Sequence, residues 1–153
     1  MNIEVTNQKA ETAIAIKKAA VNMDTMAEAM DKGYKELWDY LIKLGKQPSG
    51  PPYCAYTNGN EDFSCFDIEM GIPVGETLPV QGEIYLSKTH EGKAVCTTYK
   101  GPYHEIEVAY TALMEYLPKN SLESTGVYYD FYLNNPADTP ASELLTKVVF
   151  LVK

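Results

Sequence analysis

The sequence predicts an α+β domain of two duplicated β-α-β-β units, with antiparallel sheets and two long helices around a central cleft. The first observation is an internal repeat with an offset of 76 residues, because residues 34–41 (YKELWDYL) recur as 110–117 (YTALMEYL). The same offset carries residues 53–58 onto 129–134, so two segments repeat in register. Such a repeat predicts two similar halves with pseudo-two-fold symmetry, and the seam between halves is a natural place for a ligand cleft.

The length of 153 residues predicts one domain, 1–153, with repeat halves of approximately 1–78 and 79–153. The apolar fraction of 45% and mean hydropathy of −0.26 are typical of a globular chain. No apolar run approaches the ~18 residues that span a bilayer, and the N-terminus lacks a signal-peptide pattern. The three cysteines lack C-x-x-C spacing, which favours reduced thiols. We therefore expect a cytoplasmic protein that does not contact a membrane.

The first half is predicted to contain a strand, a helix and a hairpin. Residues 10–19 form the strand, and Thr25 with Glu28 has the form of a capping box, so the helix should begin near residue 25. Gly45 is a typical helix stop, and residues 46–52 form a loop. The helix has apolar residues at helical spacing: Met26, Met30, Leu37, Leu41 and Leu44. The hairpin and the next strand cover residues 52–57, 63–72 and 82–87, joined through 58–62 and a connection over 71–82.

The second half repeats this order. A strand at 93–99 leads through Gly101-Pro102-Tyr103 into a helix that Pro118 should end. The apolar face of this helix carries Ile106, Tyr110, Leu113 and Leu117. The remaining elements are strands at 127–133 and 146–152 with a loop at 134–140.

Strand alternation predicts which side chains face the cleft. We expect one face of each half to cover its helix and the other face to line the seam. In 127–133 the more apolar set should meet the helix, which leaves Asp130 on the seam side between Tyr128 and Tyr132. The repeat places Cys54 and Tyr56 in the equivalent positions.

The same argument applies to Glu69. Phe66, Ile68 and Met70 form the core set of strand 63–72, so Glu69 should lie on the opposite face. A carboxylate among aromatic rings attracts a lipophilic cation through its charge and through cation–π contacts. The alternative is that Glu69 and Asp130 lie on a solvated sheet face.

Aromatic residues supply the predicted walls of the site, and the 12 tyrosines exceed the usual number. Trp38 is expected to pack against the helix or to reach the cleft, and Tyr103 to hold its turn or to line the cleft. Tyr34 and Tyr110 are open to both interpretations. The wall candidates are Tyr56, Tyr85, Tyr99, Tyr132, Trp38 and Tyr103.

Other classes of site have little support. The net charge of −8 argues against direct DNA binding, which requires clustered basic residues. His90 and His104 lie in a polar loop and a first helical turn, without the converging ligands of a metal site. No nucleotide-binding or nucleophile-elbow motif is present, so we expect neither metal nor cofactor.

Five stretches together resemble the GyrI-like small-molecule-binding family, which also forms the effector-binding domain of AraC- and MerR-type multidrug regulators such as BmrR and Rob. The stretches are 66–74, 99–103, 109–113, 129–136 and 146–152. The resemblance spans the chain and implies paired β-α-β-β units around an aromatic cleft that accepts varied, often cationic, aromatic compounds. Glu69 matches the acid of the first half. Asp130 stands where the family usually has Glu, which shortens the second acid.

The chain lacks the helix-turn-helix domain of the regulators and resembles the stand-alone branch. Three functions are therefore open. The first is binding of lipophilic, cationic aromatic xenobiotics, with Glu69 as counter-charge and Asp130 as second acid. The second is hydrolysis of reactive cyclopropane-containing xenobiotics in the same cleft, with Glu69 as the candidate catalytic residue. The third is modulation of a protein partner, as in gyrase-modulating members of the family.

Overall fold

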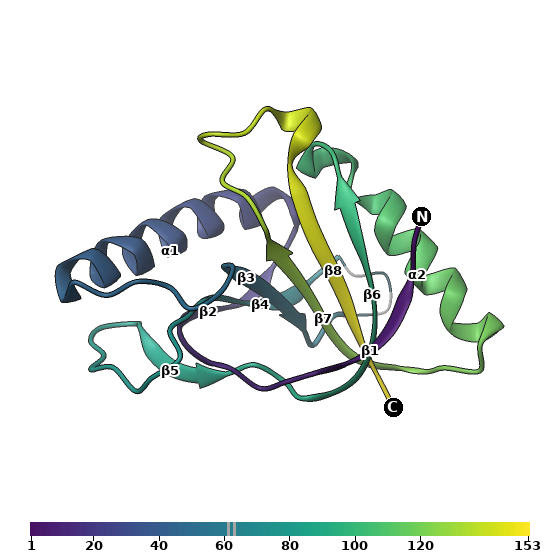
Figure 1. The fold of residues 1–153 in the computed structure, drawn as a ribbon, viewed down its shortest axis with the longest axis horizontal. Helices are drawn as coiled ribbons and strands as arrows, with labels where there is room; N and C mark the ends of the chain where they lie inside the picture. The colour runs from purple at the N-terminus through teal and green to yellow at the C-terminus, as the bar shows by residue number, and fades with distance from the viewer. Residues whose placement is uncertain (61, 63) are drawn as a thin grey trace. The chain divides into compact units, whose positions relative to one another are not determined.

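The computed structural model describes residues 1–60, 62 and 64–153, and the chain in it forms two compact units. Unit 1 consists of residues 1–9 and 91–153, and unit 2 of residues 10–90. The described residues form eight strands in antiparallel pairs and two α-helices, which confirms the predicted α+β class (Figure 1). The units divide near residues 9 and 90, and not near residue 78, because the first strand of the chain pairs within unit 1 and residues 85–88 pair within unit 2.

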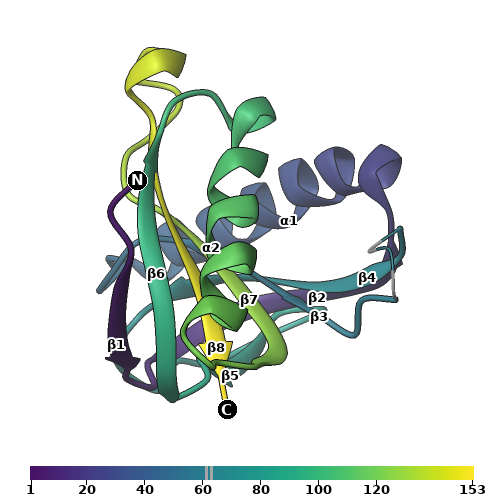
Figure 2. The same ribbon diagram turned by 90° about the vertical axis from the view of Figure 1, so that its right-hand side faces the viewer.

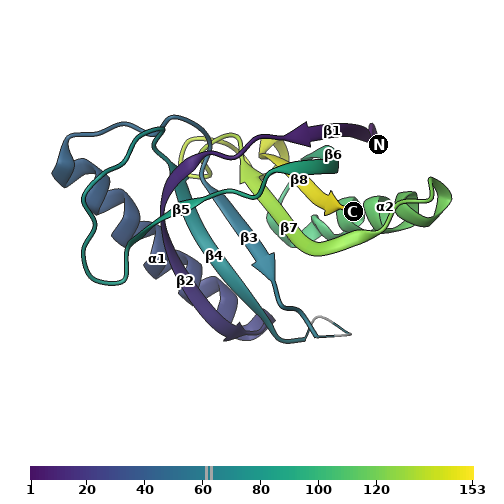
Figure 3. The same cartoon turned by 90° about the horizontal axis from the view of Figure 1, so that it is seen from below.

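Unit 2 has the predicted β-α-β-β order, followed by a short edge strand. Its elements are β2 (Thr12–Val21), α1 (Met23–Leu44), β3 (Tyr53–Thr57), β4 (Phe66–Pro73) and β5 (Tyr85–Lys88). The strand order is β3-β4-β2-β5, and α1 lies along one face of this sheet (Figure 3). The predicted strands at 63–72 and 82–87 are each displaced by a few residues. Residues 61 and 63, which fall in the predicted hairpin, lie outside the described residues.

Unit 1 repeats the scheme. Its elements are β1 (Glu4–Gln8), β6 (Gly92–Lys100), a 3-10 turn η1 (Tyr103–Glu105), α2 (Glu107–Lys119), β7 (Ser124–Tyr132), a second turn η2 (Ala141–Glu143) and β8 (Leu145–Val152). The strand order is β1-β6-β8-β7, and α2 packs on one face (Figure 2). In both units an edge strand flanks the first strand of the repeat, and the last strand of the repeat lies between the first and the second. The sequence did not predict β1, because its short, polar EVTNQ segment shows no apolar alternation.

The N-terminus of α1 differs from the prediction. The helix begins at Met23, and its capping box joins Asn22 to Thr25: the Asn22 side chain accepts from the Thr25 N–H, and Thr25 Oγ1 accepts from the Asn22 N–H. The prediction that Thr25 and Glu28 form the box was therefore wrong by three residues, since Asn is also a strong N-cap. Gly45 ends the helix as predicted, with a left-handed φ of 67°.

The C-terminus of α2 lies one residue beyond the predicted stop. Pro118 is inside the last turn, and the helix continues to Lys119 before Asn120 donates to the Leu117 carbonyl. A proline in the final turn removes one backbone hydrogen bond and does not prevent one further helical residue. The predicted apolar face is confirmed, because Leu113 and Leu117 are buried in a cluster against which Ile106 and Tyr110 pack.

The cores define the face of each sheet that carries the helix, here called the helix face. In unit 1 the core joins Leu113 of α2 to Val95 of β6 and to Val148 and Phe150 of β8. In unit 2 the backbone of Gly33 lies so close to Met70 that a Cβ on the glycine would be 2.4 Å from the Met70 sulfur. Met70 and the residues directly opposite it on β2 and β3, Ile16 and Cys54, therefore share the helix face.

Candidate functional site

Asp130 lies on the helix face of unit 1, so the predicted orientation of this strand was wrong. Asp130 is directly opposite Val148, a core residue under α2, and Tyr128 is opposite Phe150. Directly opposed residues of an antiparallel pair lie on the same face. The more apolar residues of β7 were predicted to face the helix, but α2 packs on the set that contains Asp130 and its flanking tyrosines.

The Asp130 carboxylate is buried, with only 3% of its surface exposed. The hydroxyl of Tyr110, on α2, donates to Asp130 Oδ2 at 2.5 Å. The Tyr128 ring packs edge-on against Phe150 with centroids 4.7 Å apart, and its hydroxyl accepts from Ser124 Oγ at 3.1 Å. The acid is thus held in a tyrosine-rich part of the core, where one phenol is a direct hydrogen-bond donor to it.

The other predicted aromatics of unit 1 lie near one end of the same face. Tyr132 and Tyr99 are both opposite Thr146, on either side of β8. The half-buried ring of Tyr132 packs against Tyr103 with centroids 5.6 Å apart, and burial raises the pKa of the Tyr103 phenol. Tyr99 is buried, and its hydroxyl donates to the Pro102 carbonyl at 2.8 Å. Tyr99 therefore fastens the turn before α2, a role that the sequence analysis considered for Tyr103.

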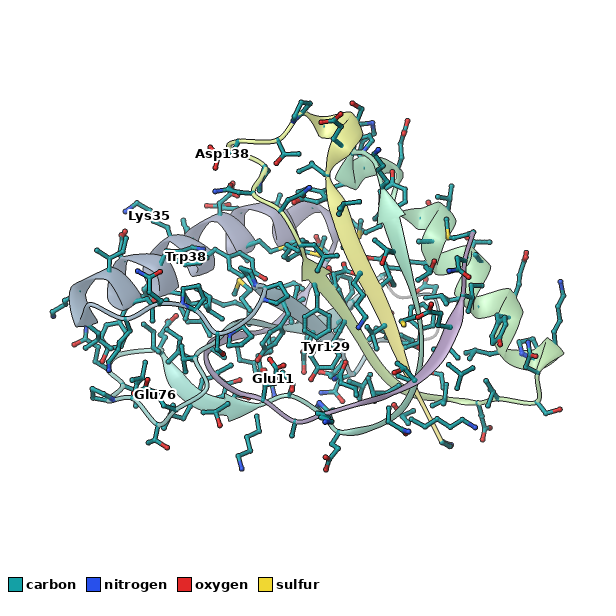
Figure 4. The ribbon with its side chains drawn as sticks, viewed as in Figure 1. Glu11, Lys35, Trp38, Glu76, Tyr129 and Asp138 are labelled. Atoms are coloured by element: carbon teal, nitrogen blue, oxygen red, sulfur yellow. The ribbon has the colours of Figure 1, made fainter. Side chains whose placement is uncertain are left out.

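Two predicted residues lie on the helix side of unit 2. Tyr56 is opposite Ile68 on β4, and its ring meets Phe66 edge-on at 5.8 Å. Tyr56 is thus on the side of the sheet that carries α1, contrary to the prediction that this face turns away from the helix. Trp38 projects from α1 and is half-buried (Figure 4). Leu37, the residue before Trp38, is buried in the core, and the two roles considered for Trp38 stay predictions.

Glu69 is on the opposite face of unit 2, as predicted, since the helix-face residues Ile68 and Met70 precede and follow it. The half-buried carboxylate is surrounded by hydroxyl donors. Tyr53 donates to Oε2 at 2.7 Å, Tyr85 donates to Oε1, and the Ser87 hydroxyl is 3.1 Å from both oxygens. The structure therefore brings two predicted residues, Glu69 and Tyr85, into direct contact.

Sequence reasoning missed Tyr53 and Ser87 as partners of Glu69. Ser87 follows Tyr85 by two residues, so period-two alternation within the predicted strand was a usable signal. Tyr53 was not recognisable in this way, because its ring reaches Glu69 across the bare backbone of Gly71. A Cβ at Gly71 would lie 2.3 Å from Cζ of the Tyr53 ring.

Six of the eight predicted residues fall into two groups, and Tyr56 and Trp38 lie apart from both, on the helix side of unit 2. Asp130, Tyr132, Tyr99 and Tyr103 belong to the tyrosine-rich part of unit 1, whereas Glu69 and Tyr85 form a hydroxyl cluster in unit 2. A depression of about 700 Å³ between α1 and residues 81–84 contains none of the predicted residues. Within the described part of the chain, no three His, Cys, Asp or Glu side chains converge as metal ligands, and no helix is long and apolar enough to cross a membrane.

The sequence matches one protein family, and the structure matches solved structures with the same fold. The family described as the GyrI-like small molecule binding domain matches residues 1–153. No curated protein matches the sequence.

Solved structures with the same fold have low sequence identity. The crystal structure of the EcmrR C-terminal domain has a TM-score of 0.86 and 16% identity, covering 99% of this chain and 97% of that chain. A cryo-EM structure of EcmrR with DNA has a TM-score of 0.84 and 16% identity over 99% of this chain; the match spans only 57% of that EcmrR chain.

Two further similar structures are a complex with a ligand and a hydrolase. SAV2435 bound to tetraphenylphosphonium has a TM-score of 0.69 and 11% identity, covering 100% of this chain and 94% of that chain. A hydrolase encoded by lin2189 from Listeria innocua has a TM-score of 0.69 and 14% identity, covering 99% and 91%. At such identities these likenesses establish the fold alone.

Proposed function

This chain belongs to the GyrI-like small-molecule-binding family, and on that premise we propose that it binds lipophilic, cationic aromatic compounds of the multidrug and xenobiotic type. The observation that carries the proposal is the Asp130 carboxylate, which is 3% exposed and lies on the helix face between Tyr128 and Tyr132. Asp130 would supply the counter-charge, and the neighbouring tyrosines would supply the aromatic surface.

The chemistry of such a site is simple. A carboxylate away from water attracts a cation more strongly than an exposed carboxylate, because the local dielectric constant is lower and salt screens the pair less. Ring faces add cation–π attraction, and they bury the apolar parts of a ligand without demanding one shape. Tetraphenylphosphonium, with which SAV2435 was solved, is a cation of this kind.

Glu69 is a second acid with a different environment. Its carboxylate is half-buried, and the hydroxyls of Tyr53, Tyr85 and Ser87 already occupy its acceptor positions. A ligand cation would have to compete with these donors. We therefore propose Asp130 as the principal counter-charge and keep Glu69, the principal acid predicted from the sequence, as the alternative.

Calorimetric titration with two probes tests this assignment. Tetraphenylphosphonium is the cation, and triphenylphosphine oxide is a neutral aromatic control. We expect Asp130→Asn to lower the affinity for the cation by roughly 10- to 100-fold and to leave the affinity for the neutral probe nearly unchanged. The matched variant Glu69→Gln should affect both probes to a similar, smaller extent. If Glu69→Gln, and not Asp130→Asn, selectively lowers the affinity for the cation, Glu69 is the counter-charge. If both variants lose the same affinity for the two probes, neither acid is a counter-charge.

Hydrolysis of a cyclopropane-containing xenobiotic is a second candidate. The observation that favours it is the hydrogen-bonded pairing of the Glu69 carboxylate with two phenols, a combination suited to acid–base chemistry. The carboxylate would take a proton from water as the oxygen bonds to a ring carbon. The ring C–C bond would break, and the released carbon would take up a proton. Product formation that Glu69→Gln abolishes would support hydrolysis, and unchanged substrate after long incubation would argue against it.

Modulation of a protein partner stays a prediction.

A further inference from the structure

Two tyrosines that the internal repeat relates to each other make different hydrogen bonds. Tyr34 on α1 and Tyr110 on α2 are separated by the repeat offset of 76 residues. The Tyr34 hydroxyl donates to the backbone carbonyl of Tyr53 at 2.5 Å, whereas the Tyr110 hydroxyl donates to the carboxylate of Asp130 at 2.5 Å. Each phenol ties its helix to the following strand, but only the bond from Tyr110 ends on an ionisable group.

We propose that Tyr110 is a specificity-determining residue, whose hydroxyl holds Asp130 in the anionic form through which the site selects cations. This inference rests on the proposed function, since it assigns a role to a residue beside the proposed counter-charge. Tyr110 is a positioning residue in this scheme, because it acts on the ligand through Asp130.

Asp130 has two protonation states, which its surroundings stabilise to different extents. Burial to 3% exposure favours the neutral acid, because a charge loses solvation in a low-dielectric interior. A hydroxyl that donates to Oδ2 stabilises the carboxylate and opposes this effect. Removal of the Tyr110 hydroxyl should therefore raise the pKa of Asp130 and leave less of the anion at a given pH.

The elements of unit 1 that pack around β7 carry other titratable groups. On the same side of the sheet as Asp130 these groups are phenols. These phenols are Tyr99, Tyr103, Tyr116, Tyr128 and Tyr132. Lys147 of β8 is opposite Phe131, so its side chain lies on the other face of the sheet. The charged residues of α2, such as Glu107 and Glu115, are exposed.

The repeat provides a matched control, because Tyr34→Phe removes an equivalent hydroxyl from the other unit. The affinity for tetraphenylphosphonium, whose charge does not vary with pH, should be measured between about pH 4 and pH 8 for the parent protein and both variants. Affinity should fall as Asp130 becomes protonated. In Tyr110→Phe the midpoint of this fall should move up by about one pH unit. In Tyr34→Phe it should move by less than about 0.3 unit. Equal midpoints for Tyr110→Phe and the parent protein would overturn the inference.

A ligand-free measurement separates this inference from the proposed function. The carboxyl ¹³C signal of Asp130, assigned with Asp130→Asn, can be titrated by NMR in folded protein without a ligand. A pKa of Asp130 that rises in Tyr110→Phe and not in Tyr34→Phe supports the role of the hydroxyl even if tetraphenylphosphonium fails to bind. An unchanged pKa of Asp130 in Tyr110→Phe refutes it even if the cation binds through Asp130.

Discussion

Replacement of Gly71 by alanine should reveal how tightly the Glu69 cluster is built. Gly71 has no unusual φ angle, so alanine is allowed by the backbone and the cost is steric. The new Cβ would lie 2.3 Å from Cζ and 2.4 Å from the hydroxyl oxygen of Tyr53, a side chain with 0% exposure. Tyr53 must therefore move, and its hydrogen bond to Glu69 must lengthen or break.

The expected loss is the sum of two contributions. Forcing an extra carbon into a packed core costs about 1–3 kcal/mol. Loss of a hydrogen bond to a charged group adds about 1.5 kcal/mol, the lower end of the usual range because Glu69 is half-buried. We expect Gly71→Ala to lower the free energy of unfolding by about 2.5–4.5 kcal/mol. The corresponding fall in Tm is roughly 10 °C for a chain of this size.

Urea denaturation of the single and double variants tests this reasoning. Tyr53→Leu removes the ring atoms that collide with the new Cβ, so Gly71→Ala added to Tyr53→Leu should cost less than about 1 kcal/mol. The two changes should thus be strongly non-additive. A loss below about 1 kcal/mol for Gly71→Ala alone, or an equal loss with and without the Tyr53 ring, would refute the steric explanation.

Three further predictions concern the remainder of unit 2. Gly33→Ala should change the free energy of unfolding by less than about 1 kcal/mol in urea denaturation, because the flexible end of Met70 can move and alanine favours the helix. A loss of stability as large as that of Gly71→Ala would contradict this. Asn22→Ala should cost about 1 kcal/mol through the lost N-cap, and Asn22→Asp should restore it in the same assay. Hydrogen bonds from the Asn58 side chain and from the backbone N–H of Ala20 lower the pKa of Asp67 below 3.8. The stabilising contribution of the Asp67 carboxylate is therefore present above pH 3.8 and is lost as the pH falls through the lowered pKa. Asp67→Asn should thus be less stable than the parent protein at pH 7, and the two stabilities should converge in acid. A stability difference independent of pH would contradict this.

Local signals explain which parts of the candidate site were predictable. The outward orientation of Glu69 followed from three apolar residues at alternate positions of its strand, and this parity was confirmed. The same argument failed for Asp130, because β7 carries tyrosines on both faces. Tyrosine suits either a core or a polar surface, so the contrast between the faces was too weak to choose the helix side.

Contacts between distant residues were beyond local reasoning. The position of Gly71 beside Tyr53 depends on the β3–β4 register, and the bond from Tyr110 to Asp130 depends on how α2 packs over β7. The assignment of β1 to unit 1 likewise depends on its pairing with β6, across most of the chain length.

The sequence by itself determined the class of the fold, the repeated order of strand, helix and hairpin, and the family. The fold class and the order of elements follow from periodicity, turn residues and the repeat, whereas the family follows from five stretches that resemble it. The tertiary structure decided which acid is buried, which hydroxyls meet each carboxylate and which sheet face each helix covers. The physical reason is that strand register and helix packing select a face by the summed burial of many side chains, and no single residue encodes that sum.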